Sequence, residues 1–299
     1  MTAYSSAQRA GALIVDKPAG ISSHDVVGRI RKLAGTRKVG HGGTLDPMAT
    51  GVLVVGLNRA TRLLGHLQSS DKEYLATIRL GQTTVTDDAA GALTESADTS
   101  TVHQDAIDEA ISGFSGEIHQ VPSRVSAVKV GGRRSYDRVR AGEEVELAAR
   151  PVTVWSFQRV APIRANEYID VDVRVVCSSG TYVRALARDV GAFLNVGGHL
   201  TALRRIRVGP FDIDQATGIS TLETSNRLLP VIPVGQFAGQ MFSRRTLDPD
   251  DAARVRHGAR ISAAGLDDSG PVALFDPNGE FLALYEFRRQ TGRALAVFV

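Results

Sequence analysis

One segment of the chain, residues 169–175, limits the fold more than any other feature of the sequence. Apolar and charged side chains alternate strictly along it, in the order Ile169, Asp170, Val171, Asp172, Val173, Arg174 and Val175. Because successive side chains of a strand point to opposite faces, the segment predicts a strand with one buried and one solvated face. Such strands are typical of antiparallel sheets, so helices are expected to cover only the buried face.

The other periodic segments predict an α/β fold of the α+β type, with a mixed, largely antiparallel sheet. Strands are expected at residues 11–15, 52–57, 74–80, 125–130 and 152–160, the last of these pairing with 168–176. A helix is expected between a cap at Ser22 or Ser23 and a stop at Gly35. The polar segment 81–101 is predicted to be an exposed loop.

The clearest helix is expected over residues 182–194. Its apolar stripe consists of Val183, Leu186, Ala187, Val190, Phe193 and Leu194. These positions recur at helical spacing on one face, so we expect all of them to be buried against the sheet.

Length and composition favour two domains and exclude several classes of protein. The chain has 299 residues, 43% of them hydrophobic, and we expect one domain at 1–235 and a small β-barrel at 236–299. The longest uncharged apolar stretch, residues 51–57, is too short to cross a membrane, and residues 1–10 lack the apolar core of a signal peptide. A cytoplasmic protein is therefore expected. A single cysteine, Cys177, excludes internal disulfides and thiolate zinc clusters.

A glycine-rich segment, residues 40–47, lies between two expected strands and carries the strongest functional signal. Three of its first four residues are glycines, which allow close approach to a ligand, and the other, His41, offers a ring that can stack. Taken alone, Asp46 followed by Pro47 is typical of a helix N-cap. The segment lacks the Gly-Lys-Ser/Thr of a phosphate-binding loop, and Leu45 replaces the third glycine of the dinucleotide fingerprint. Nucleotide-cofactor binding is therefore disfavoured.

Positive charge is gathered in three clusters, although the net charge is only +3. Residues 29–38 hold five cations and no anion, and the third cluster is residues 204–207. The second cluster comprises Lys129, Arg133, Arg134, Arg138 and Arg140. All three fit contacts with nucleic-acid phosphates, and each also fits an ordinary solvated surface.

The glycine-rich segment, extended to GHGGTLDPMATG over residues 40–51, resembles the catalytic loop of the TruB family, the tRNA pseudouridine synthases that modify the T-loop uridine. Gly42 stands where the family loop commonly has Thr, so this chain lacks that hydroxyl. Further segments resemble family motifs in the same order along the chain: Val15–Pro18, Asp71–Tyr74, Val121–Lys129, Cys177–Arg184 and His199–Arg205. These collinear motifs lie between residues 11 and 207. The C-terminal part resembles the family's PUA domain in its position and its β character.

The resemblance implies a role for each site residue. Asp46 would be the carboxylate that attacks the ribose C1′ or the base, or that otherwise promotes departure of uracil. Arg184 would be the fixed cation that keeps this carboxylate ionised in a closed pocket, and Tyr74 would stack on the extracted base and help to move its C5 proton. Without the resemblance, Arg184 also fits a surface arginine and Tyr74 an ordinary core residue.

The resemblance also implies a set of substrate-binding residues. These are His41, Lys17, Tyr182, Leu203 and Lys129. His41 would stack in the space vacated in the RNA loop, Tyr182 and Leu203 would form a wall around the base, and Lys17 would support the site.

The implied reaction converts uridine to pseudouridine at position 55 of tRNA and requires no metal and no cofactor. The implied partner is tRNA, bound through its T-loop and stem, with the protein acting as a monomer without an obligatory protein partner. One rival is an RNA-binding protein that assists tRNA folding, with catalysis absent or secondary. Another is a glycosidase, which would need paired carboxylates and would release a free base.

Overall fold

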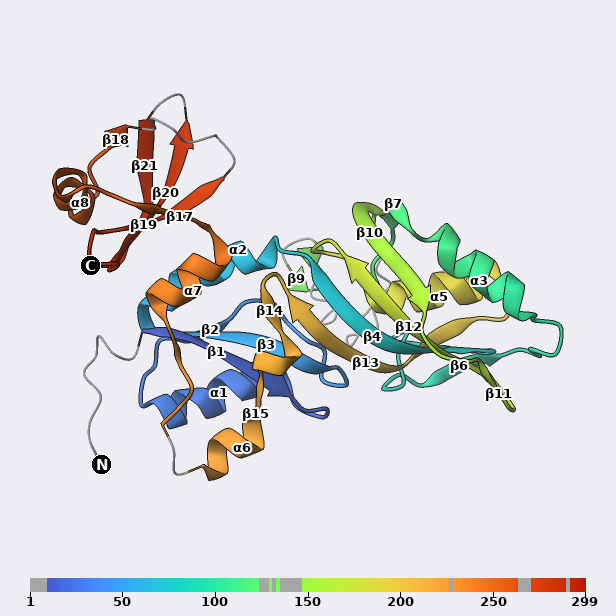
Figure 1. Cartoon of the computed structure of the whole chain (residues 1–299). Helices are drawn as coiled ribbons and strands as arrows, with labels where there is room; N and C mark the ends of the chain where they lie inside the picture. The colour runs from blue at the N-terminus through green and yellow to red at the C-terminus, as the bar shows by residue number, and fades with distance from the viewer. Residues whose placement is uncertain are drawn as a thin grey trace.

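The computed structural model describes residues 10–123, 129–130, 133–134, 147–225, 228–262, 270–288 and 291–299, with only the backbone described at 129–130 and 133–134. The fold is mixed α/β, as predicted, and contains one large sheet and one small C-terminal sheet. Figure 1 shows the C-terminal sheet as a compact unit at one end of the large sheet, beyond the helices α2 and α7.

Eight strands form the main path of the large sheet. In spatial order they are β15 (Thr217–Gly218), β1 (Gly11–Lys17), β3 (Thr50–Leu57), β13 (Gly198–Val208), β4 (Lys72–Leu80), β12 (Ile169–Cys177), β10 (Arg150–Arg159) and β7 (Gly116–Gln120). Four short strands pair at the flanks: β2 (Val39–His41) on β3, β11 (Arg164–Ala165) on β12, β14 (Phe211–Asp212) on β13 and β16 (Ile232–Pro233) on β1. Among the strand pairs described for this sheet, only β1–β15 and β3–β13 are parallel, so the prediction of a largely antiparallel sheet is confirmed.

The two halves of this sheet are covered differently. In β12 the apolar residues are buried, while Asp170, Asp172 and Arg174 lie on the polar face, where Arg79 forms an ion pair with Asp170 and Thr77 donates a hydrogen bond to Asp172. Strands β1 and β3 instead are buried on both faces, between α1 on one side and α2, α7 and the C-terminal sheet on the other. The single solvated face predicted for the sheet is therefore confined to its β4–β12–β10 half.

Helix boundaries agree with the local sequence signals. Helix α1 (Ser23–Ala34) has Ser22 as its N-cap in a capping box and ends at Gly35, which adopts the left-handed conformation. The other helices are α2 (Leu64–Gln68), which follows the 3₁₀ turn η1 (Asn58–Leu63), α3 (Gln104–Gly113), α5 (Val183–Phe193), α6 (Ile219–Thr224), α7 (Val234–Met241) and α8 (Pro249–Arg256). A second 3₁₀ turn, η2 (Ile213–Gln215), follows β14. Within the described ranges, no helix is long and apolar enough to span a membrane.

Two local predictions are wrong. Phe193 is 55% exposed instead of buried, because it is the last residue of α5 and lies beyond the part of the helix that packs on the sheet. Segment 81–101 is not simply an exposed loop: it contains the hairpin of β5 (Gln82–Thr84) and β6 (Leu93–Ser96), and Asp88 between these strands is buried.

The C-terminal sheet joins the rest of the molecule through a shared apolar core. Its strand order is β17 (Ser243–Thr246), β19 (Pro271–Phe275), β20 (Phe281–Arg288), β21 (Thr291–Val297) and β18 (Ile261–Ser262). Phe275, Phe281 and Phe298 from this region pack in one cluster with Phe237 of α7 and Phe211 of β14. The expected boundary at residue 235 falls within α7.

Part of the predicted hairpin near residue 130 is described. Strand β8 (Lys129–Val130) pairs antiparallel with β9 (Arg133–Arg134), as the Gly131-Gly132 signal predicts. Residues 124–128 and 135–146, which include Arg138 and Arg140, lie outside the described residues, as do the side chains of β8 and β9.

Candidate active site

The segment that carries Asp46 connects β2 to β3 without forming a helix. The chain bends at Pro47 and Met48 and enters β3 at Thr50, so the interpretation of Asp46 as a helix N-cap is wrong. Glycine is required at position 51, where φ is +100° and a Cβ would lie 2.1 Å from the carbonyl oxygen of Arg205. The carboxylate of Asp46 is 37% exposed, so it lies at a surface that a ligand can reach.

Arg184, in the first turn of α5, forms an ion pair with Asp46. Its Nε lies 2.9 Å from Asp46 Oδ2, and its Nη1 donates a hydrogen bond of 2.8 Å to the carbonyl of Thr86. The Arg184 side chain is only 5% exposed, which excludes the alternative of an ordinary surface arginine. A guanidinium in this position holds the carboxylate in a fixed orientation.

Asp88 is a second carboxylate at this arginine that sequence reasoning missed. Its Oδ2 lies 3.6 Å from Arg184 Nε, and its side chain is 6% exposed. The Oδ1 atom accepts hydrogen bonds from Thr86 Oγ1 at 2.6 Å and from the backbone amide of Ala90 at 3.0 Å. The polar composition of residues 81–101 concealed this role, since only the tertiary fold brings Asp88 to α5.

A cavity of about 190 Å³ opens beside the Asp46–Arg184 pair. It is lined by Thr44, Leu45, Asp46, Tyr74, Gly180, Thr181, Tyr182, Val183, Arg184 and Leu203. Five of the eight predicted site residues therefore meet at one cavity, from the β2–β3 connection, β4, α5 and β13. The cavity combines one carboxylate with aromatic and aliphatic walls, which suits a small planar ring.

Two aromatic residues shape this cavity. Burial raises the pKa of the Tyr74 phenol, and the nearby charge of Arg205 partly opposes that shift, so Tyr74 is neutral at physiological pH. Tyr182 is fixed through its backbone: its amide donates to Gln120 Oε1 at 2.8 Å, and its carbonyl accepts from Gln120 Nε2 at 3.1 Å.

Two further predicted site residues, Lys17 and His41, lie outside the cavity lining. Lys17 is fully buried below the Asp46 segment, where its Nζ donates to the carbonyls of Pro18, Ile21 and Pro47 at 2.9, 2.7 and 3.2 Å. Burial lowers the pKa of Lys17 to about 8, although the charge of Asp46 counteracts this effect. For Lys129 only the backbone is described.

His41 ends β2 at the edge of the glycine-rich segment. Its ring makes an edge contact with His24, with 5.8 Å between ring centroids, and its Nδ1 is buried without a hydrogen-bond partner. Burial and the charges of His24 and Arg205 lower the pKa of His41, which favours a neutral ring.

The third basic cluster, residues 204–207, does not form the free phosphate-binding surface that its sequence suggests. Arg205 is only 2% exposed, so it cannot reach a phosphate. Arg204 is paired with Asp16 at 2.8 Å, and Arg207 with Asp71 at 2.9 Å. Carboxylates thus already neutralise its partly exposed members.

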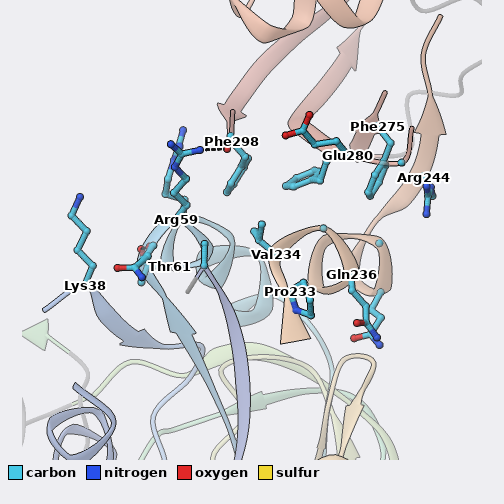
Figure 2. A pocket seen from close by; sticks show the side chains of 18 residues that line it. Lys38, Arg59, Thr61, Pro233, Val234, Gln236, Arg244, Phe275, Glu280 and Phe298 are labelled. Atoms are coloured by element: carbon cyan, nitrogen blue, oxygen red, sulfur yellow. Dashed lines mark hydrogen bonds between the residues drawn. The ribbon is translucent and has the colours of Figure 1, made fainter. Parts of the chain in front are cut away.

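A larger groove, of about 1510 Å³, lies beside the shared core, with residues of the C-terminal sheet on one side and residues of η1 and α7 on the other (Figure 2). Arg59 reaches across it and donates a hydrogen bond to the carbonyl of Phe298, and Arg62 donates to the carbonyl of Val297 at 2.7 Å. Arg244 lies over the ring of Phe275, 4.0 Å from its centroid. The groove contains none of the predicted site residues. Nowhere in the described ranges do three His, Cys, Asp or Glu side chains converge as metal ligands.

Comparison with known proteins gives matches over nearly the whole chain. Three family models match: "TruB family pseudouridylate synthase (N terminal domain)" over residues 31–183, "tRNA pseudouridylate synthase B C-terminal domain" over 184–229 and "tRNA Pseudouridine synthase II, C terminal" over 242–299. The tRNA pseudouridine synthase B of Streptomyces griseus is 53% identical over 294 residues, which cover 96% of this chain and 97% of that protein. The protein of the same name from Thermobifida fusca is 54% identical, over 96% of this chain and 98% of its own.

Solved structures agree with this match. The "Crystal Structure of a Cbf5-Nop10-Gar1 Complex" contains a chain that is 28% identical with a TM-score of 0.72, covering 98% of this chain and 85% of that one. The "Structure of H/ACA RNP bound to a substrate RNA containing 2'-deoxyuridine" gives 27% identity and a TM-score of 0.69, over 96% and 84% of the two chains.

Fold, site and matches together define a pseudouridine synthase, an isomerase that acts on RNA. The chain belongs to the TruB family, and its relatives from Streptomyces griseus and Thermobifida fusca are tRNA pseudouridine synthases.

Proposed function

We propose that this enzyme converts uridine to pseudouridine at position 55, in the T-loop of tRNA, with Asp46 as the essential carboxylate. The observation that carries the proposal is the Asp46–Arg184 ion pair, 2.9 Å long, which lines a cavity together with Tyr74, Tyr182 and Leu203. The buried guanidinium of Arg184 holds the Asp46 carboxylate in a fixed orientation at the cavity, and the cavity suits a uracil swung out of the RNA.

The reaction is an isomerisation, so the product has the same elemental composition as the substrate. The bond between uracil N1 and ribose C1′ breaks, the base turns, a bond forms between C5 and C1′, and the C5 proton leaves as N1 gains one. No water is consumed and no group is oxidised. Asp46 promotes the first step by attack on C1′ or on the base, or by assisting elimination of uracil. Tyr74 replaces the lost stacking, and its neutral hydroxyl relays the C5 proton by taking it up as it gives its own proton away.

The same geometry gives less support to the two rival functions. A glycosidase needs two carboxylates that flank the bond, and Asp46 is the only acid among the residues described as lining the cavity. A protein that only binds or folds tRNA does not need a buried arginine paired with a carboxylate beside a base-sized cavity. We also propose that the same complex assists tRNA folding as a secondary role.

We assign residues 1–235 to the catalytic domain and residues 236–299 to a PUA-like RNA-binding domain. The groove supports this division, because residues of both parts line it. Its cations are Lys38, Arg59, Arg62 and Arg244, and Glu280 is its only described acid. Such an excess of cations is complementary to the phosphates of the tRNA stem. We expect the enzyme to act in the cytoplasm on tRNA, as a monomer and without an obligatory protein partner.

One experiment tests the proposal. Purified protein is incubated with a T-arm hairpin, and the nucleosides are separated by chromatography after digestion. Wild-type protein is expected to yield pseudouridine at one position, while Asp46→Asn yields none and keeps its RNA affinity within about tenfold, because most of the affinity comes from phosphate contacts. The exposed Asp98→Asn serves as the matched control and retains activity. Product from Asp46→Asn, or release of free uracil by the wild type, would refute the mechanism.

A further inference from the structure

The segment around Asp46 has no regular secondary structure, yet all five of its backbone carbonyls from residue 43 to 47 accept hydrogen bonds. The carbonyls of Leu45, Asp46 and Pro47 accept from Ser23 Oγ, from the amide of Ala49 and from the amide of Gly20, respectively. The first two carbonyls, those of Gly43 and Thr44, both accept from the guanidinium of Arg205, at 3.0 and 3.4 Å. The conformation of this segment therefore depends on side-chain donors, and Arg205 supplies two of the contacts.

Arg205 lies on β13, the middle one of three neighbouring strands beside the site. Strand β13 runs between β3 and β4, and Arg205 is in register with Gly51 on one side and Tyr74 on the other. Its Nε donates a hydrogen bond of 2.8 Å to the carbonyl of Val52. One guanidinium thus ties the chain before Asp46 to the chain after it.

The cation of Arg205 is buried without an acidic partner. It is 2% exposed, and in the described parts of the chain no carboxylate lies within 4 Å of its nitrogens. Burying a charge that has no carboxylate partner is costly, so a purely structural brace would be better made by a neutral donor. The same charge shifts the pKa of Tyr74 and His41, which shows that its field reaches the aromatic residues beside the segment.

We propose that Arg205 is a positioning residue for the isomerisation. By gripping the backbone on both sides of Asp46, it holds that carboxylate against Arg184 and toward Tyr74 before the substrate binds. This preorganisation acts on the rate of the chemical step and not on tRNA affinity, because the buried guanidinium cannot touch RNA. The inference rests on the proposed function and adds a residue to it.

The test is the variant Arg205→Lys. Lysine keeps the positive charge, but a single ammonium lacks the planar fork that reaches three carbonyls at once. The single-turnover rate of pseudouridine formation is expected to fall about 10- to 100-fold, with the Kd for tRNA unchanged within about twofold. Arg79→Lys is the matched control. Arg79 also makes a two-armed contact, with Asp170, but on the polar face of the sheet. Loss of that contact should leave the single-turnover rate within about twofold of the wild-type rate.

Each outcome decides the question. A folded Arg205→Lys protein with the wild-type rate overturns the proposal. Parallel loss of thermal stability, tRNA affinity and rate, or failure of both Arg205→Lys and Arg205→Gln to fold at low temperature, assigns Arg205 to the scaffold and overturns it as well. If the wild type itself makes no pseudouridine, the proposed function fails instead, so the two failures are distinguishable.

Discussion

Asp88→Asn tests whether the buried arginine at the site depends on its second carboxylate. The substitution removes a negative charge that lies 3.6 Å from Arg184 Nε, with both side chains nearly inaccessible to solvent. Asparagine retains an oxygen that can accept from Thr86 and Ala90, but its amide group presents donors to the guanidinium. Arg184 would then have Asp46 as its only charged partner among the described residues.

The size of the effect follows from the distance and the burial. At 3.6 Å and an effective dielectric constant of about 20, the attraction is ~4.6 kcal/mol. Breaking one buried pair typically costs ~3–5 kcal/mol, and because Asp46 still neutralises the arginine we expect ~3 kcal/mol of lost unfolding free energy. Because Arg184 is also released from its fixed orientation, the turnover rate should fall about tenfold or more.

Two measurements check this prediction. Urea unfolding gives the stability change, and release of tritium from C5-labelled uridine in tRNA gives turnover, since the C5 hydrogen leaves when the new bond forms. Asp87→Asn is the matched control: its partner Arg188 also contacts Asp189, so we expect a loss below ~1 kcal/mol and near-normal turnover. If Asp88→Asn matches the wild type in stability and turnover, the assigned role of Asp88 is wrong.

Two further predictions concern the surroundings of Asp46. Burial holds the pKa of Lys17 at about 8, below its ordinary 10.5, so the unfolded chain binds more protons between these pH values and the unfolding free energy rises with pH there. Lys17→Met should reduce the rise between pH 7.5 and 9.5 by ~1–2 kcal/mol in urea titrations, and an unchanged slope would contradict the burial argument. In Gly42→Thr, the new Cβ would lie 2.8 Å from a methyl carbon of the buried Leu67, so unfolding free energy should fall by ~1–3 kcal/mol. The double variant with Leu67→Ala should lose less than the sum of the two single losses, because the truncated side chain no longer clashes. Thermal melts of the single and double variants measure this, and full stability of Gly42→Thr would show that the pocket accepts the larger residue.

The local signals of the sequence were sufficient for several of the elements, although they did not predict the central strand β13. Ser22 and Gly35 delimit α1 because a serine cap and a left-handed glycine act within one helical turn. The alternation in residues 169–175 predicts β12 because strand geometry requires it, and it also gives the polar face of that half of the sheet. The resemblance of motifs identified five residues that line one cavity, although their elements are far apart in the chain.

Other features could not be predicted because they depend on distant partners. Asp88 belongs to a segment with the polar composition of a loop, and it is buried only because the fold brings it against Arg184 of α5. Arg205 belongs to a cluster that favoured a phosphate surface, yet β13 places it inside the sheet between β3 and β4. Asp46-Pro47 fits a helix N-cap, and only the pairing of the following residues as β3 excludes that interpretation.

The sequence by itself therefore determined the periodic elements and the family, and it indicated Asp46 as the candidate catalytic carboxylate. These depend on patterns of a few neighbouring residues, whose geometry is set by the backbone. The tertiary structure alone decided which charges are buried and which partner each one meets. Burial and pairing of a charge depend on the positions of side chains about 100 residues apart, as for Asp88 and Arg184, and no local pattern encodes that distance.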